Sequence, residues 1–188
     1  LPTLSADRLK IAQSLLPPIG QRPEVLDWFD AAMPQRVRLD LDSAWGESWL
    51  LLALFNWDDQ RQELDFSLPD YNIQTEGTYW LRDFWQGDIL RIRGDESIEI
   101  SRAAHWVRLL AARAVDRNLP VYLGSSLHIS QGLEVKGSQW QADEGTLDLY
   151  FERPGHNSGI VELSLPGSPL SACLDGNDIE WVSTSKGT

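Results

Sequence analysis

The sequence predicts an all-β protein, an antiparallel β-sandwich of the Greek-key type preceded by one short α-helix. After Pro34 the hydrophobic period changes from that of a helix to the two-residue period of a strand. Strand-like segments then recur about every 8–12 residues between turns rich in glycine and proline, which is typical of antiparallel sandwiches. Residues 49–55 form an unbroken apolar run, which is short for a helix and ordinary for a strand.

The first element is expected to be an amphipathic helix of about a dozen residues. Ser5 can cap its start, and two prolines at 17 and 18 end it. The apolar positions at helical spacing are Leu9, Ala12 and Leu16, with Ile11 and Leu15 beside them. A helix this short is unstable alone in water. Its apolar face is therefore expected to fold back on the β-domain or to pack against another copy of the chain.

Residues 18–34 are expected to form an irregular linker, because Gly20, Pro23 and Pro34 interrupt any regular pattern. The first group of predicted strands is 37–42, 48–56, 64–68, 78–85, 89–92, 98–100 and 104–112. The last of these could be strand or helix, and the alternation of Trp106, Arg108 and Leu110 favours a strand.

The run from 48 to 56 is apolar at both odd and even positions, so it is expected in the middle of a sheet with packing on both faces. Leu52 and Leu54 should then lie on one face. Leu51, Ala53 and Phe55 should lie on the other face, and all five side chains should be largely buried.

A second group of predicted strands is 120–123, 126–135, 145–151, 160–165, 169–174 and 178–183. The expected organisation is a helix at 1–17, a linker at 18–34 and a β-sandwich at 35–188. The sandwich contains two strand groups, 35–115 and 119–188. Whether these form one sandwich or two stacked sheets is left open by the sequence.

The composition limits the classes of partner that this protein is expected to bind. A formal net charge of −12 argues against nucleic acid and against an anionic membrane surface, which both need a basic face. No apolar run approaches the length of a membrane-spanning helix, and no signal peptide is recognised. Cys173 is the single cysteine, so no intrachain disulfide is possible. The compartment stays unfixed, with the cytoplasm as the expectation.

Residues of the types used in catalysis and metal binding are present without the spacing that either needs. The three histidines are His105, His128 and His156, and with one cysteine they give no zinc pattern; no cofactor is expected. His105 and His128 are expected as half-buried, hydrogen-bonded sheet residues, and His156 in a solvated turn. The acid pairs at 58–59 and 143–144 are expected in turns, since glycosidases place two carboxyls about 5–10 Å apart across a sugar. Ser125 and Ser126 lack the context of a nucleophile elbow.

Nine tryptophans are a high number for 188 residues. Large packing residues in a β-rich core are one explanation. Stacking against a neutral carbohydrate is the other. Trp57 and Trp85 follow predicted strands and are the candidate sugar-stacking residues.

Four segments carry a resemblance to a known family. They are residues 4–9, residues 15–20 with a Leu-Leu-Pro-Pro-Ile-Gly sequence, the strand and turn at 49–57, and the aromatic strand at 77–85. Residues 122–132 add a later stretch found in some members. Together they resemble the end of the catalytic barrel and the C-terminal β-domain of α-galactosidase-type glycosidases, glycoside hydrolase family 36 or a relative.

The resemblance implies that residues 1–17 are the remnant of the last helix of a catalytic barrel. It implies that the rest is a non-catalytic β-domain, whose partner is the barrel of the same parent chain. The family's catalytic aspartates sit on barrel strands, so no catalytic residue carries over to this sequence. The alternative is a carbohydrate-binding module that uses its aromatic side chains.

Overall fold

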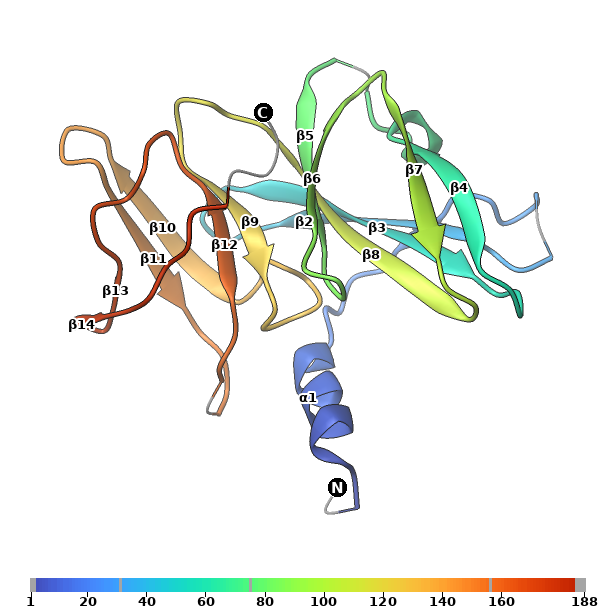
Figure 1. The fold of residues 1–188 in the computed structure, drawn as a ribbon, viewed down its shortest axis with the longest axis horizontal. Helices are drawn as coiled ribbons and strands as arrows, with labels where there is room; N and C mark the ends of the chain where they lie inside the picture. Colours follow the sequence, from blue (N-terminus) through green and yellow to red (C-terminus); the bar gives the residue numbers. More distant parts are fainter. Residues whose placement is uncertain (1–2, 31, 75, 156, 185–188) are drawn as a thin grey trace.

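The computed structural model describes residues 3–30, 32–74, 76–155 and 157–184. Every strand pairing in this part of the chain is antiparallel. The single α-helix lies at the N-terminal end (Figure 1). The predicted all-β fold is therefore confirmed. No helix within these ranges is long and apolar enough to cross a bilayer.

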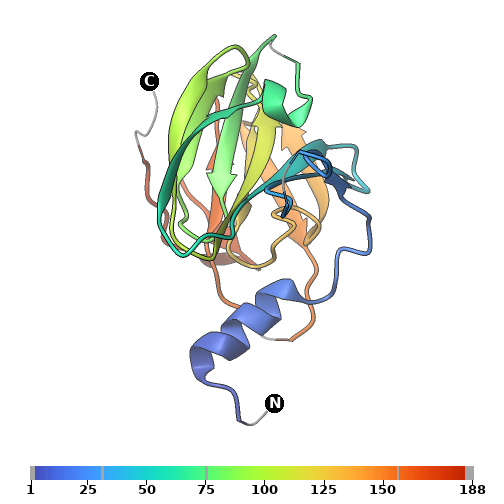
Figure 2. The same ribbon diagram turned by 90° about the vertical axis from the view of Figure 1, so that its right-hand side faces the viewer.

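Helix α1 (Ala6–Leu15) is shorter than the predicted dozen residues. It begins where Ser5 Oγ accepts a hydrogen bond from the Arg8 amide at 3.4 Å, as expected of a serine cap. Figures 1 and 2 both show α1 extending away from the strands. The expectation that this helix folds back on the β-domain is wrong.

The largest sheet has six strands in the order β1–β2–β3–β8–β5–β6. Their bounds are Glu24–Val25, Arg36–Asp42, Ser48–Asn56, Trp106–Ala114, Thr78–Asp83 and Ile89–Arg93, respectively. β1 falls in the predicted linker, where sequence alone gave no strand. The assignment of 104–112 as a strand is confirmed by β8.

Strand β3 lies in the interior of this sheet, between β2 and β8. Leu52 and Leu54 belong to one core cluster and are 0% and 4% exposed. Leu51 belongs to a second cluster on the opposite face. The predicted two-sided burial is confirmed, except that Phe55 is only half-buried near the strand end.

A second layer packs on the first face of the sheet. It consists of β4 (Gln62–Ser67) paired with β7 (Ser97–Arg102), with a short 3-10 helix η1 (Pro69–Tyr71) after β4. Phe66 and Ile100 from this layer join Leu52 and Leu54 in the main core. The chain leaves the sheet after β3 to form β4, returns for β5 and β6, leaves again for β7 and returns at β8, the neighbour of β3. This crossing between layers is what makes the fold a sandwich.

The remaining strands form three two-stranded pairs beside the sheet (Figure 1). β9 (Val121–Ser125) pairs with β12 (Val161–Ser164), and β10 (Val135–Gln141) pairs with β11 (Thr146–Phe151). β13 (Cys173–Leu174) and β14 (Asn177–Asp178) make a short final pair.

Three strand predictions in this region differ from the structure. Residues 126–134 form an irregular buried loop, because their polar side chains bond within the interior instead of completing a ladder. The predicted strands 169–174 and 178–183 reduce to the two-residue strands β13 and β14. Both of these strands are exposed, so no packing extends their pairing.

Candidate functional site

The most elaborate polar arrangement in the molecule lies where β9 and the loop 126–134 meet the central sheet. We call it the junction cluster, and its members are Arg82, Arg113, Gln131, Glu134 and Glu162. Four of these side chains are fully buried, and only Glu162 is partly exposed. Buried charges require paired partners, since an isolated ion in the interior is very costly. Each buried charge of the junction cluster therefore needs a partner of opposite charge or a hydrogen-bonding group within the protein.

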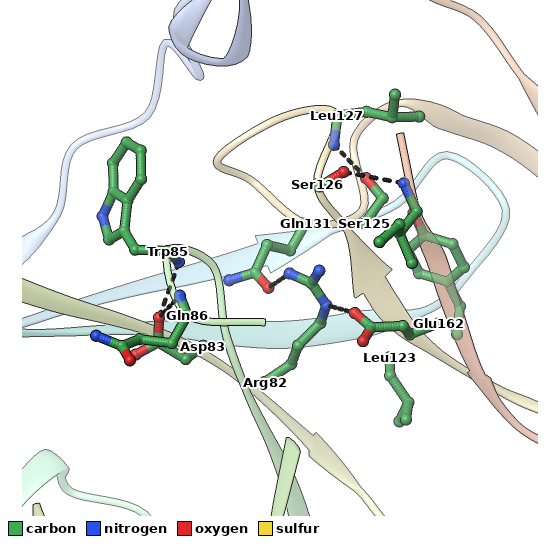
Figure 3. Close-up of polar contacts among 12 residues, drawn as sticks. Arg82, Asp83, Trp85, Gln86, Leu123, Ser125, Ser126, Leu127, Gln131 and Glu162 are labelled. Carbon is green, nitrogen blue, oxygen red and sulfur yellow. Dashed lines mark hydrogen bonds and ion pairs between the residues drawn. The ribbon is translucent and has the colours of Figure 1, made fainter. Parts of the chain in front are cut away.

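Arg82 projects from β5 toward the second strand group. Its guanidinium pairs with the Glu162 carboxylate of β12 and donates to Gln131 Oε1 at 2.8 Å (Figure 3). Gly124 of β9 has a φ of +146° and lies against it: a Cβ there would be 2.7 Å from Arg82 Cδ. Glycine at 124 thus lets the arginine pass from one sheet to the other.

Arg113 makes a second connection, from β8. It donates to the backbone oxygens of Leu123 and Gln131 at 2.8 and 2.6 Å. Its guanidinium lies over the rings of Trp49 and Tyr122, 4.9 and 5.5 Å from their centroids, an arrangement that favours a cation. Burial lowers the pKa of Arg113 to about 10, so the side chain stays charged at neutral pH.

Glu134, at the end of the loop 126–134, is the residue on which the loop's hydrogen bonds converge. Its carboxyl accepts hydrogen bonds from the Tyr122 hydroxyl at 2.9 Å, the Gly132 amide at 2.9 Å and the Ser125 hydroxyl. Burial raises the pKa of Tyr122, which keeps its phenol protonated as a donor. Three donors on one carboxyl make this loop an ordered part of the interior.

The junction cluster joins the two strand groups. The Glu134 carboxyl accepts hydrogen bonds from the protein, and the partly exposed Glu162 pairs with Arg82 through Oε2. Within the described residues, no group of three or more histidine, cysteine, aspartate or glutamate side chains could hold a metal ion.

A cavity of about 250 Å³ lies next to the cluster, between the turn at 43–47 and strands β9, β10 and β11. Its wall includes Trp45, Glu47, Tyr122, Ser138, Leu147 and Leu149. Burial raises the pKa of Glu47, and the charge of Arg113 opposes this rise. Nothing in the local sequence pattern distinguishes Glu47 from a surface carboxylate in a turn, so the sequence does not predict its burial.

Neither of the two candidate sugar-stacking residues lines this cavity. Trp57 is 42% exposed, stacks on Phe55 with 5.1 Å between ring centroids, and donates from Nε1 to the Pro34 oxygen at 2.7 Å. Trp85 is half-buried and meets Phe84 edge to face at 4.9 Å. They follow β3 and β5, which β8 separates. Each indole packs on a phenylalanine of its own segment, and no ring contact joins the two tryptophans among the described residues.

Asp83, next to Trp85, has a structural role. Its Oδ1 accepts from the backbone amides of Trp85 and Gln86 at 2.8 and 2.9 Å (Figure 3), and its carboxyl also pairs with Arg108. Burial raises the pKa of Asp83. Its contacts hold the turn after β5, an arrangement that the aromatic strand pattern alone did not indicate.

The histidine predictions need correction. His105 is in an exposed turn before β8, with a φ of 49°, and its Nε2 lies 2.8 Å from Asp59 Oδ1. His128 is 3% exposed and hydrogen-bonded, but in the loop 126–134 instead of a strand. His156 lies outside the described residues.

The acid pairs lie in turns, as expected, and the two serines form hydrogen bonds within the protein. The pair at 58–59 lies in the exposed turn after β3, and the pair at 143–144 lies in the exposed turn between β10 and β11. Ser125 is buried and donates to Glu134, while the Ser126 hydroxyl accepts from the Ile160 amide at 2.9 Å. Ser125 thus bonds within the junction cluster, and Ser126 holds the backbone at residue 160.

Helix α1 presents a different surface. The side chains of Leu9, Ile11 and Leu15 are 39%, 47% and 40% exposed, so these three positions have no full cover among the described residues. The C-terminal end of the helix is anchored: the Ser14 oxygen accepts from the Ile129 amide at 3.0 Å, and Arg153 donates to the oxygens of Gln13 and Leu16 at 2.7 and 3.0 Å.

No protein-family model and no curated protein matches this chain. Among solved structures, it is similar in part to a protein of Bacillus halodurans C-125 whose suggested activity is that of an α-N-acetylgalactosaminidase. That match has 24% sequence identity and a TM-score of 0.34, over 46% of this chain and 19% of the other. It is also similar in part to α-galactosidase I of Mortierella vinacea, with 20% identity and a TM-score of 0.35, over 45% of this chain and 22% of the other. The chain spans about a fifth of the length of each of these structures.

Proposed function

We propose that this chain is the non-catalytic β-domain of a larger glycoside hydrolase of the α-galactosidase type. In this proposal, α1 is the last helix of the catalytic barrel and the strands support that barrel from its C-terminal side. The barrel of the parent chain is the partner, and the catalytic carboxylates reside there.

The observation that carries the proposal is the state of α1. A helix of ten residues is marginal in water without tertiary packing. Yet α1 extends away from the strands (Figure 2), and the side chains of Leu9, Ile11 and Leu15 are exposed. Contiguous exposed apolar surface marks an interaction site. An outer helix of a (β/α)8 barrel packs its apolar face on the barrel strands, which is the cover that this face lacks.

The sequence adds support of a second kind. The segments that resemble the glycosidase β-domain coincide with β3, β5 and β9, and the Leu-Leu-Pro-Pro segment coincides with the end of α1. The buried carboxyls of the junction cluster are occupied by protein donors, and the acid pairs lie in exposed turns. In this proposal, the catalytic carboxylate pair belongs to the barrel that precedes this domain in the parent chain.

Two measurements test the proposal. The coding sequence upstream of Leu1 should encode an eight-stranded barrel with an aspartate at the C-terminal end of at least two strands. An unrelated upstream domain, or a start codon immediately before Leu1, would overturn it. The purified chain should also fail to hydrolyse an aryl α-galactoside, and turnover at rates of about 1 s⁻¹ or more would contradict the non-catalytic role.

A carbohydrate-binding module is the alternative, favoured by one observation. Trp57 keeps an exposed indole that is fixed by Phe55 and by the Pro34 oxygen, and a rigid exposed aromatic face suits stacking. Titration of the chain with soluble galactosides should then change the tryptophan fluorescence, and Trp57→Ala should abolish the change. An identical titration curve for Trp57→Ala would remove Trp57 from this role.

A further inference from the structure

One end of the central sheet is apolar on both of its faces. Leu54 of β3 and Leu110 of β8 point to the face that the β4–β7 pair covers, and both are buried. The residues that alternate with them point to the other side, which we call the open face. Antiparallel partners share a face of the sheet. The strand registers therefore place its members side by side, with Val37, Ala53 and Leu109 in one row and Phe55 and Val107 in the next.

The open face is only partly shielded from solvent. Val37, Phe55 and Val107 are half-buried, and Trp57, which stacks on Phe55 and continues this face, is 42% exposed. A sheet face turned to water normally carries polar side chains, whereas these positions on three neighbouring strands are apolar. A contiguous apolar surface of this kind marks a place where another body docks.

Helix α1 leaves the molecule from the same side of the sheet. Ile19, just after the helix, packs on the second core cluster, which lies on this side, and Figure 1 shows α1 below β8 and β7 above it. The exit of the helix is fixed, because the Ser14 oxygen accepts from the Ile129 amide and the Pro17 oxygen accepts from His128 Nε2. A body that covers α1 is therefore held next to the open face.

The side chains of the open face decide which class of partner it suits. A carbohydrate needs placed hydrogen-bonding groups, but the described strand residues here supply only hydrocarbon and aromatic side chains, and the Trp57 indole N–H already donates to the Pro34 oxygen. A second copy would bring another net charge of −12 against the first, which opposes association. A body tethered through α1 has instead a high effective concentration at this face.

We propose that the open face is covered by the body to which α1 belongs, the segment that precedes residue 1 in the parent chain. The inference rests on the proposed function, which identifies that body as the catalytic barrel. It adds the side of the β-domain on which the barrel lies, the side of Val37, Phe55 and Val107 rather than that of the β4–β7 pair. Trp57 is then an interface residue, which excludes it from stacking on a sugar.

Hydroxyl-radical labelling with mass spectrometry, applied to residues 1–188 and to the full-length product of the parent gene, tests this inference. Trp57 and Trp106 are matched reporters, because both are 42% exposed. Trp106 pairs with Asn56 and so points to the opposite face. In the full-length product the oxidation of Trp57 should fall about fivefold or more, since an interface core excludes water, while that of Trp106 should change by less than about twofold.

A charge on the open face supplies a second arm of the test. In the full-length product, Val107→Lys should raise the oxidation of Trp57 to within about twofold of its level in residues 1–188, because burying an unpaired ammonium is costly. Trp106→Lys, at the neighbouring position on the other face, is the control and should leave Trp57 protected. Circular dichroism of each variant in residues 1–188 shows whether it folds, and the comparison of the two unaltered proteins needs no variant.

Equal oxidation of Trp57 in the two unaltered proteins overturns the inference, as does protection of Trp106 with Trp57 left reactive. Protection of Trp57 that grows with the concentration of residues 1–188 alone identifies a second copy as the occupant and also overturns it. Failure of the proposed function shows separately, as an upstream sequence that encodes a domain other than a barrel. The labelling then still reports whether the body joined to α1 covers this face.

Discussion

At the residue scale, His128 links the interior to the end of α1. A carbonyl oxygen can only accept, so the contact of 2.8 Å between Nε2 and the Pro17 oxygen assigns the proton to Nε2. The Ser130 amide donates to Nδ1 at 3.2 Å, which requires that nitrogen to be unprotonated. Burial lowers the pKa of His128, and Arg153 and Lys136 lower it further, against the opposing effects of Pro17 and Glu134.

The lowered pKa gives a prediction for stability against pH. The unfolded chain takes up a proton near pH 6.5, while folded His128 resists it, so the unfolded state binds more protons and stability falls as the pH drops below about 6.5. His128→Gln keeps a donor near Pro17 and removes the titration. Urea unfolding between pH 8 and pH 5.5 should show a smaller loss of stability for His128→Gln than for the unaltered chain.

His105→Gln, on an exposed turn, is the matched control, and it should retain the pH dependence of the unaltered chain. Equal pH dependence of His128→Gln and the unaltered chain would show that His128 is not held neutral by its surroundings.

At the element scale, the strands that sequence patterns predicted well are those whose burial is set by their own side chains. β3 was found because its apolar run is buried on both faces, and β8 because Arg108, Leu110 and Ala112 alternate with the residues between them. In the loop 126–134 this logic fails. Leu127, Ile129 and Leu133 mimic a strand, but burial is decided by the hydrogen bonds that Glu134 accepts from β9 and from the loop itself.

The same limit applies to the candidate sites. Arg82 was visible only as one polar residue in an aromatic strand, and its partners Gln131 and Glu162 are 49 and 80 residues away in the sequence. Such pairings depend on the placement of sheets relative to one another, which local periodicity does not specify. The sequence could place the exposed acid pairs in turns, because turn chemistry is local.

Helix α1 supplies the element-scale prediction. Deleting residues 1–12 removes exposed apolar surface and keeps Ser14 and Pro17, whose oxygens bond the interior. The melting temperature should stay within a few degrees, since 1 kcal/mol corresponds to about 2–4 °C for a chain of this size. Deleting residues 1–18 should cost more, because the Ile129 amide and His128 Nε2 lose their acceptors. Equal melting temperatures for the two deletions would contradict the anchoring role of residues 14–17.

At the scale of the whole molecule, the junction cluster ties the two strand groups together. Arg82 and Arg113 come from the central sheet, and their acceptors come from β9, β12 and the loop 126–134. Separating the two groups would leave each buried arginine without its partners, and an unpaired buried charge is strongly destabilising. The two groups are therefore expected to unfold as one cooperative unit.

Hydrogen exchange can test this cooperativity. In the unaltered chain, the slowest amides of β3 and of β10 should exchange with similar free energies of opening, as expected when both open only in global unfolding. Arg113→Met leaves the oxygens of Leu123 and Gln131 without their donor and Glu47 without its counter-ion, a loss of about 3–5 kcal/mol for a broken buried pair. That loss falls on the contact between the groups, so β10 and β11 should exchange faster while β3 keeps much of its protection.

Leu52→Ala, which costs about 2–5 kcal/mol within the core of the sheet, should instead speed exchange in both groups together. If Arg113→Met also lowered protection equally in β3 and β10, the two groups would share a single core, and the arginine would not be what couples them.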